Sequence, residues 1–324
     1  MLLSDRSFKS YDDQDDDPSG PSARDQAFFH PSREPGLHFD RLTRSQRSNL
    51  SKAVDFFKLY FTLELVSNIC LFTNNYALAN IHNFVSYGDK EGFWSDPVTV
   101  EEMYKFIAVV IFMGFHELPS ISDYWSSSWT CFTPVPRAFG TRIRFESILQ
   151  FLKVVDHTKE DKKKEGKLTK IKYILEYIKD KCMSLFQPPC LLSIDERMVK
   201  SKGRSGMRQY IRDKPIKWGY KLWVLADAKT GYTSNFFVYT GKQEGTIQHG
   251  LGYKVVFDLL EDFKNQGYHI FIDNFYTSVQ LLQDLHKLKT FVTGTMLINR
   301  KNSDSHFYES NVCLSNNMFI LLFL

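Results

Sequence analysis

The hydrophobic positions of the chain recur with a helical period up to about residue 185. Apolar residues return every three or four positions, which predicts amphipathic helices over residues 52–60, 64–78, 99–114, 141–155 and 169–185. Ser51 and Thr99 are placed to cap two of these helices, and Glu102 stands at capping-box distance from Thr99. The 99–114 helix is apolar nearly all round, so we expect it to be buried. In the 141–155 helix, Arg142 and Arg144 are expected to face solvent.

The period changes after Pro188 and Pro189, where extended segments replace helices. We predict strands over residues 191–199, 220–226, 232–239, 267–275 and 290–295, with helices over 252–264 and after the cap residue Thr277. The first three strands are typical of an antiparallel meander. The continuous apolar run Ile270–Ile272 suits a central strand buried on both faces. This order is that of a ribonuclease-H-like α/β fold, in which the first strand lies centrally beside the fourth.

Two of the predicted strands deliver carboxylates. Asp195 lies at the end of the first strand and Asp273 at the end of the fourth. If these strands are neighbours, the two aspartates meet and form a site for two divalent metals, Mg²⁺ or Mn²⁺, for phosphodiester chemistry. Alone, Asp195 would be an ordinary strand-end residue; the second carboxylate favours metal ligation. Glu196 should point to the opposite side from Asp195, and Asp273 should be nearly buried and need a partner.

The net charge of +4 averages two unequal segments. Residues 1–40 hold nine acidic and four basic side chains; we predict a disordered acidic tail over 1–45, and the alternative is a tail that competes with DNA for a basic groove. Residues 197–221 hold nine basic residues and one acidic residue, with Tyr210 and Trp218 interleaved. A solvated loop is the simple alternative, but the charge excess favours a surface that follows DNA phosphates. The candidate DNA-binding residues are Arg204, Arg208, Arg212, Lys214, Lys217 and Lys221.

Composition narrows the cellular compartment and the kinds of partner that we expect for this protein. The five cysteines are scattered without a Cys-x-x-Cys pair, which predicts no zinc site and favours a reducing, intracellular compartment. The longest apolar runs are shorter than the roughly 20 residues that span a bilayer, and we expect no signal peptide. We therefore expect neither a membrane nor a small-molecule substrate as partner. Residues 160–172 are typical of a lysine-rich solvated linker, and a nuclear import signal is the alternative.

Several motifs in this order resemble the piggyBac-type transposases. Ser193–Met198 is similar to the first catalytic block of that family, Arg208–Lys221 to its basic block and Ile272–Ser278 to its second catalytic block. Asp273 follows Asp195 by 78 residues, which is also typical of the family. Upstream, the motifs at residues 73–77, 123–126 and 144–145 match its N-terminal helical domain. The likeness covers roughly residues 46–298.

The resemblance implies a function as well as a fold. It implies cut-and-paste DNA transposition through hairpin ends, insertion at TTAA, a homodimer and action in the nucleus. It also implies that Asp195 and Asp273 are catalytic and bind Mg²⁺ or Mn²⁺. A third catalytic aspartate is implied well downstream, often with a C-terminal zinc module.

The segment after residue 298 departs from this pattern. It lacks family character and a helix for the third carboxylate, and nothing in the sequence positions Asp304 or Glu309 as a substitute. We therefore expect an acidic tail (1–45), a helical dimerisation and DNA-binding domain (46–157), a basic linker and helix (158–190), an incomplete ribonuclease-H-like domain (191–298) and a divergent tail (299–324). The leading hypothesis is a truncated DNA-binding derivative with little or no transposition. The alternatives are a non-enzymatic interaction module built on the helical domain, or a fragment whose fifth strand is an unpaired edge.

Overall fold

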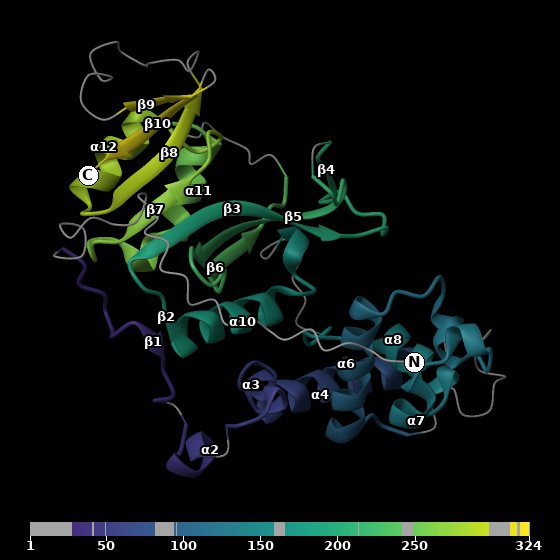
Figure 1. Cartoon of the computed structure of the whole chain (residues 1–324). Helices are drawn as coiled ribbons and strands as arrows, with labels where there is room; N and C mark the ends of the chain where they lie inside the picture. The colour runs from purple at the N-terminus through teal and green to yellow at the C-terminus, as the bar shows by residue number, and fades with distance from the viewer. Residues whose placement is uncertain are drawn as a thin grey trace, which may run out of the picture.

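A computed structural model describes residues 28–40, 42–48, 50–81, 94, 96–158, 166–212, 214–241, 249–297, 312–315 and 318–323. Helices dominate the first half and a mixed sheet with flanking helices forms the second (Figure 1). The predicted ribonuclease-H-like assignment fits this arrangement.

The helical half is built on three long helices and two shorter ones. They are α3 (Ala53–Tyr60), α4 (Leu63–Asn80), α6 (Val100–Phe115), α7 (Val135–Phe139) and α8 (Arg142–Phe151). Threonine hydroxyls cap three of them: Thr62 accepts from Leu65 N, Thr99 from Glu102 N and Thr141 from Arg144 N. Leucine, methionine, isoleucine and phenylalanine side chains from α4, α6 and α8 fill the common core. The cap expected at Ser51 was wrong by one residue, because α3 has Lys52 at its N-cap and Asp55 accepts from the backbone N–H groups of both.

Two expectations for this half were wrong. Helix α6 is buried on one face only, and Val110, Ile111 and Phe115 are 45%, 42% and 87% exposed. Among the described residues, the core of this half takes up only one side of the helix. Arg144 does not face solvent: its guanidinium makes two hydrogen bonds, of 2.7 and 2.8 Å, to the carboxylate of Glu102 on α6. This pair joins α8 to α6.

Part of the segment expected to be a disordered tail is ordered in the structure. Strand β1 (Gly36–Leu37) pairs with β2 (Phe186–Gln187), and the Arg33 guanidinium donates to the carbonyls of Met183 and Ser184. These carbonyls lie at the C-terminal end of α10 (Lys172–Leu185), where backbone oxygens lack helical partners. Long-range hydrogen bonds therefore order residues 28–40. Residues 1–27 lie outside the described part of the chain.

The second half contains an eight-stranded sheet in the order β4-β5-β3-β7-β8-β10-β9, with β6 also paired to β5. The strands are β3 (Leu191–Lys200), β4 (Gln209–Tyr210), β5 (Trp218–Asp227), β6 (Thr233–Val238), β7 (His269–Ile272), β8 (Phe291–Leu297), β9 (Val312–Ser315) and β10 (Met318–Phe323). The antiparallel meander of β3, β5 and β6 is confirmed. The predicted neighbours β3 and β7 pair in parallel, which is also confirmed.

The segment expected to be a divergent tail contributes two strands. Strand β10 pairs antiparallel with β8 and with β9. Strand β8 is therefore paired on both sides, with β7 and with β10, and the expectation of an unpaired edge there was wrong. Met318–Phe323 is a strongly apolar segment, and residues of this kind favour a strand that joins the sheet. Residues 298–311, including Asp304 and Glu309, lie outside the described residues.

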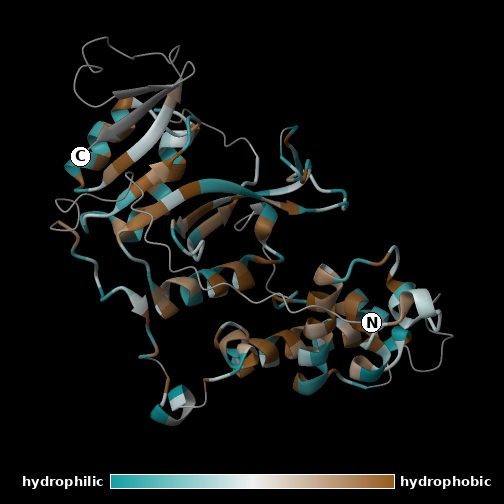
Figure 2. Cartoon of the chain, viewed as in Figure 1, coloured by the Kyte–Doolittle hydropathy of each residue, from teal (hydrophilic) through white to brown (hydrophobic). Residues whose placement is uncertain are grey.

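Two helices cover the sheet core. Helix α11 (Leu251–Leu259) and helix α12 (Val279–Lys287) bury leucines and valines against β3, β5, β7 and β8. Helix α12 is capped by Ser278, whose hydroxyl accepts from Leu281 N, and not by the predicted Thr277. Hydrophobic residues concentrate in the packed helices and central strands, whereas the loop that carries β4 is mainly hydrophilic (Figure 2).

Hydrogen bonds also connect the two halves. The hydroxyl groups of Tyr60 on α3 and Tyr232 before β6 are 2.6 Å apart, and Tyr232 donates to the Cys182 carbonyl on α10. Among the residues the structure describes, no single helix is long and apolar enough to cross a membrane. The α3–α4 pair, bent by 59°, meets that test only by length and composition.

Candidate metal and nucleic-acid site

The parallel pairing of β3 with β7 brings the two predicted catalytic aspartates to the end of that pairing, beyond the last residue of β7. The last registered pair is Ile194 with Ile272, and Asp195 and Asp273 are the next residues along the two segments. The expectation that Asp195 ends its strand was wrong, because β3 continues to Lys200 through its pairing with β5. The carboxyl ends of neighbouring parallel strands are where sites form in open α/β sheets. The predicted pairing of the two strands is therefore confirmed, and the joint role of Asp195 and Asp273 stays a prediction.

The loop after β7 holds Asp273 from both sides. Its carboxylate accepts the backbone N–H of Phe275, and its own carbonyl accepts the Thr277 hydroxyl at 2.8 Å. Asp273 is nevertheless exposed, so the expectation of a nearly buried carboxylate was wrong. The apolar run Ile270–Ile272 ends one residue earlier, and the chain turns out of the sheet at Asp273. The carboxylate therefore reaches solvent and does not need a buried partner.

A lysine from the basic segment contacts the carboxylates of β3. Lys214 Nζ lies 3.2 Å from Glu196 Oε1 and 3.9 Å from Asp195 Oδ2. Glu196 is in phase with the core residues Leu192 and Ile194, so the expected alternation holds, but Lys214 reaches both side chains. Partial burial alone would lower the pKa of Lys214. The hydrogen bond to Glu196 and the neighbouring carboxylates outweigh burial and raise that pKa.

A second lysine approaches the same carboxylates across aromatic rings. Lys221 Nζ lies 3.9 Å from the ring centroid of Trp223 and 5.3 Å from that of Phe275, which stack on each other with centroids 5.5 Å apart. Burial lowers the pKa of Lys221, and the Glu196 carboxylate opposes this shift incompletely. The ring faces stabilise a cation that burial would otherwise disfavour. Lys221 is thus a half-buried cation positioned by β5 and the loop after β7.

Tyr276 supplies a buried hydroxyl beneath this cluster. Its side chain is fully buried, and its hydroxyl makes no hydrogen bond of standard geometry among the described residues. Burial first, and then the charges of Glu196, Asp195 and Asp273, raise the pKa of Tyr276. The hydroxyl therefore stays protonated. The neighbouring Glu196 carboxylate also contributes to this pKa shift as a hydrogen-bond acceptor, so Tyr276 is a buried donor beside the carboxylates.

These residues fit a divalent ion of the Mg²⁺ class as a two-carboxylate site. Asp195 and Asp273 are exposed oxygen ligands at one edge, and Mg²⁺ commonly binds through one or two carboxylates with water or substrate phosphates completing its shell. Among the described residues, no group of three His, Cys, Asp or Glu side chains is arranged to hold a metal. Asp195 and Asp273 would hold the ion, which when bound stabilises negative charge on phosphate oxygens.

The six predicted DNA-binding residues separate into three groups. Arg204, Arg212 and Lys217 are exposed on the surface. Lys214 contacts the carboxylates of β3, and Lys221 lies over the Trp223 ring. Arg208 lies over the Trp218 ring, with its guanidinium carbon 4.5 Å from the ring centroid. Three of the six therefore remain free for contact with phosphate, and contact with DNA stays a prediction for all of them.

Sequence reasoning missed the contact of Lys214 with the carboxylates and the buried Tyr276. Lys214 belongs to a loop that closes on itself through the hydrogen bond from Ile211 N to Lys217 O, of 2.9 Å. That closure returns the loop over β3, and no local pattern predicts it. Tyr276 stands three residues after Asp273, so its place in the second catalytic block was a signal that could have identified it.

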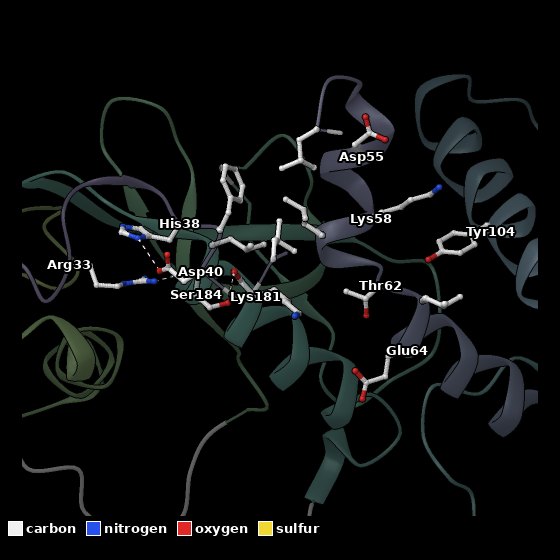
Figure 3. A pocket seen from close by; sticks show the side chains of 16 residues that line it. Arg33, His38, Asp40, Asp55, Lys58, Thr62, Glu64, Tyr104, Lys181 and Ser184 are labelled. Atoms are coloured by element: carbon white, nitrogen blue, oxygen red, sulfur yellow. Dashed lines mark hydrogen bonds and ion pairs between the residues drawn. The ribbon is translucent and has the colours of Figure 1, made fainter. Parts of the chain in front are cut away.

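A cavity of about 390 Å³ beside Asp195, Glu196 and Lys214 opens at this site. A larger cavity of about 740 Å³ lies away from the carboxylates, between the N-terminal segment, α3, α4 and α10 (Figure 3). Its charged residues carry both signs, and Arg33 is already bound to the α10 carbonyls. We place the functional site at the smaller cavity, because Asp195, Glu196 and Lys214 line it.

Comparisons with known proteins identify the family of this chain. A family model described as Transposase IS4 matches residues 52–317. Human PiggyBac transposable element-derived protein 3 is 30% identical over 222 residues, which are 67% of this chain and 37% of that protein. Human PiggyBac transposable element-derived protein 2 is 26% identical over 255 residues, which are 75% of this chain and 39% of that protein. The chain thus spans less than half the length of these relatives.

A solved structure shares the fold. It is the cryo-EM structure of the piggyBac transposase synaptic complex with hairpin DNA, with a TM-score of 0.69 and 23% identity, over 90% of this chain and 63% of that one. The family match covers most of the chain, and the structural match extends across both halves. This chain therefore belongs to the Transposase IS4 family, among its piggyBac-type members.

Proposed function

We propose that this chain is a DNA-binding derivative of a piggyBac-type transposase that retains two carboxylates of the catalytic centre and carries out little or no transposition alone. The observation that carries the proposal is the register of β3 and β7, which sets Asp195 beside Asp273 at one sheet edge. Exposed cations of the adjacent basic segment supply phosphate contacts. The similar piggyBac structure, which is a complex with hairpin DNA, supports DNA as the partner.

The division of work among the residues follows from their positions. Asp195 and Asp273 would hold Mg²⁺ or Mn²⁺, and the ion would stabilise charge on the attacking and leaving oxygens of a phosphodiester. Arg204, Arg212 and Lys217 would orient the DNA backbone by charge, without reading its sequence. Among the described residues two carboxylates come together, and an ion held by two carboxylates has fewer protein ligands than an ion held by three. For this reason we propose binding without efficient strand transfer.

DNA binding is tested by a salt titration. We expect the purified chain to bind duplex DNA with an affinity that falls steeply with salt concentration. Replacing Arg204, Arg212 and Lys217 together by alanine should reduce the slope of log affinity against log salt by about 2 to 3, because each lost phosphate contact removes about 0.9. Binding that is absent, or insensitive to salt, would remove DNA from the proposal.

Catalysis is tested separately. The chain is incubated with hairpin or nicked DNA flanked by TTAA in the presence of Mn²⁺, and we expect binding with little cleavage or joining. Asp273→Asn is the matched control, since it removes one charge without a change in size. Efficient strand cleavage that disappears in Asp273→Asn would refute the proposed inactivity.

We also propose the nucleus as the site of action and a homodimer as the assembly. Microscopy of a tagged chain would check the first, and light scattering would check the second.

One observation favours a second candidate function. Val110, Ile111 and Phe115 of α6 leave an apolar face uncovered among the described residues, and Phe115 is 87% exposed. Such a face is typical of a surface that contacts another protein. The helical half could then act as a non-enzymatic interaction module in chromatin. Loss of a co-purified partner in Phe115→Asp, with DNA binding retained, would favour this function over the first.

A further inference from the structure

A pair of half-exposed aromatic rings lies at the tip of the β4–β5 ribbon. Tyr210 and Trp218 face each other in the antiparallel register, with ring centroids 4.9 Å apart and ring planes inclined by 49°. Tyr210 is 52% exposed and Trp218 is 49% exposed. About half of each ring surface is therefore available to a ligand. The contact between the two rings, which helps to hold the hairpin, covers only one side of each ring.

Backbone contacts hold this tip in place. Gly219 follows Trp218, and a Cβ atom at this position would lie 2.2 Å from the Val199 carbonyl oxygen of β3. Only glycine therefore allows β5 to approach β3 so closely here. The hydrogen bond from Ile211 N to Lys217 O closes the loop between the two rings. Both rings are thus presented by paired backbone, which limits the entropy that a ligand must remove on binding.

Cations surround the ring pair. The Arg208 guanidinium lies 4.5 Å over the Trp218 ring and donates to the Lys202 carbonyl at 3.3 Å. Within the part of the chain that the structure describes, no carboxylate forms an ion pair with Lys202, Arg204 or Lys217. Lys200 is different, because its Nζ lies 3.4 Å from Glu117. The tip therefore combines flat apolar faces with unneutralised positive charge.

This combination selects one class of ligand. An acidic peptide would satisfy the cations but has no need of two ring faces. A DNA duplex offers phosphates to the cations, but its base faces are covered by neighbouring bases. Unpaired bases expose their faces and carry phosphates between them, so they match both features, and base–aromatic stacking tolerates any sequence.

We propose that Tyr210, Trp218 and Arg208 form a stacking platform for unpaired bases of a single-stranded DNA segment, with phosphates bound by the flanking cations. The platform deepens the proposed DNA-binding function and rests on it. It assigns the substrate class at the ribbon tip as single-stranded or frayed DNA. The carboxylate site lies further along the same two strands, where Asp195 of β3 pairs with Val224 of β5.

The test compares single-stranded and double-stranded DNA on the full chain. Fluorescence anisotropy is measured with a labelled 15-nucleotide oligothymidylate and with a blunt duplex of equal length, in wild type, Trp218→Leu, Trp218→Phe and Lys217→Ala. We expect Trp218→Leu to weaken single-strand binding about 5- to 150-fold, the range of one lost stacking contact. Its salt slope should be unchanged, since no charge is lost. Trp218→Phe should retain most of the affinity.

The charge control behaves differently. Lys217→Ala should weaken both ligands and reduce the salt slope by about 0.7 for the single strand and 0.9 for the duplex. Equal weakening of both ligands by Trp218→Leu would show that the rings only stabilise the hairpin, and would overturn the platform. If wild type binds the duplex with normal salt dependence but Trp218→Leu has no effect on the single strand, the platform fails and the DNA-binding proposal stands. Absence of salt-sensitive binding to either ligand would overturn both.

A second measurement does not depend on a variant that folds. The unaltered chain is irradiated with an oligonucleotide that carries 5-iodouracil, and the cross-linked peptide is identified by mass spectrometry. We expect the cross-link at Trp218 or Tyr210, because photocoupling requires a base in contact with the ring. Cross-links confined to other aromatic residues would overturn the proposal.

Discussion

Lys214 is expected to weaken metal binding at the two aspartates, and its removal should therefore strengthen it. Its ammonium lies 3.9 Å from Asp195 and 3.2 Å from Glu196. The cluster of Asp195, Glu196 and Asp273 carries three negative charges, and Lys214 and Lys221 carry two positive ones. A dication must therefore displace Lys214 or tolerate its repulsion. Lys214→Ala removes both obstacles.

The magnitude follows from the distance. Two unit charges about 4 Å apart interact by about 1 kcal/mol in water-like surroundings. This water-like value applies, and not the larger energy of a buried pair, because the Asp195 side chain is 63% exposed. A dication doubles this energy to about 2 kcal/mol, which corresponds to roughly a 30-fold change in affinity. We expect Mn²⁺ to bind Lys214→Ala roughly 10- to 30-fold more tightly than wild type.

The assay measures free Mn²⁺ by electron paramagnetic resonance during titration of the apo protein. Lys214→Arg keeps the charge and should bind Mn²⁺ nearly as wild type does. Lys217→Ala removes the same charge from the same loop, and it should change the affinity less than threefold because no described carboxylate pairs with it. If Lys214→Ala binds Mn²⁺ no more tightly than Lys217→Ala does, Lys214 does not control the site. A loss of Mn²⁺ binding in Lys214→Ala would refute the reasoning outright.

Three further results are expected from local contacts. Arg144→Ala should lower the free energy of unfolding by about 2 to 4 kcal/mol in urea titrations, because it leaves a partly buried carboxylate unpaired; a change under 1 kcal/mol would contradict this. Gly294→Ala would place a methyl group 2.5 Å from Thr277 Oγ1, and should cost about 1 to 3 kcal/mol in the same assay. Burial raises the pKa of the Cys182 thiol to about 11, so its alkylation should stay slow at pH 8 and accelerate as pH approaches 11. The less buried Cys131 should react first by peptide mapping, and faster labelling of Cys182 would contradict its burial.

The strand order was predictable because it depends on local patterns. The continuous apolar run at 270–272 identifies a central strand. Residues 191–194, which include Ser193, alternate buried and half-buried side chains, and an aspartate follows each of the two segments. Parallel pairing of β3 and β7 then determines that Asp195 and Asp273 meet. The carboxylate half of the site could thus be predicted from sequence, because side-chain chemistry and strand ends coincide there.

Other features depend on contacts between distant parts of the chain, and these could not be predicted. Residues 28–40 have little hydrophobic periodicity, and Arg33 is ordered by carbonyls about 150 residues away. Arg144 resembles any exposed helical arginine until α8 packs near α6 and brings Glu102 within 2.7 Å. Lys214 belongs to a basic segment, where a phosphate contact is the natural expectation. Only the closure of its loop turns it to Glu196 instead.

The lysines near Asp195, Glu196 and Asp273 stabilise the fold when no metal is bound. Carboxylates from two adjacent strands repel each other, and a centre of this kind is strained unless a cation lies among them. Lys214 of the basic loop provides that cation from within the chain, and the charge of Lys221 on β5 adds to it from its place over the Trp223 ring. The same lysines reduce the attraction of the site for a dication. Residues that stabilise the metal-free fold therefore oppose metal binding. Asp273 is exposed, and no lysine among the described residues lies within 4 Å of its carboxylate, so we expect a metal to bind this carboxylate first.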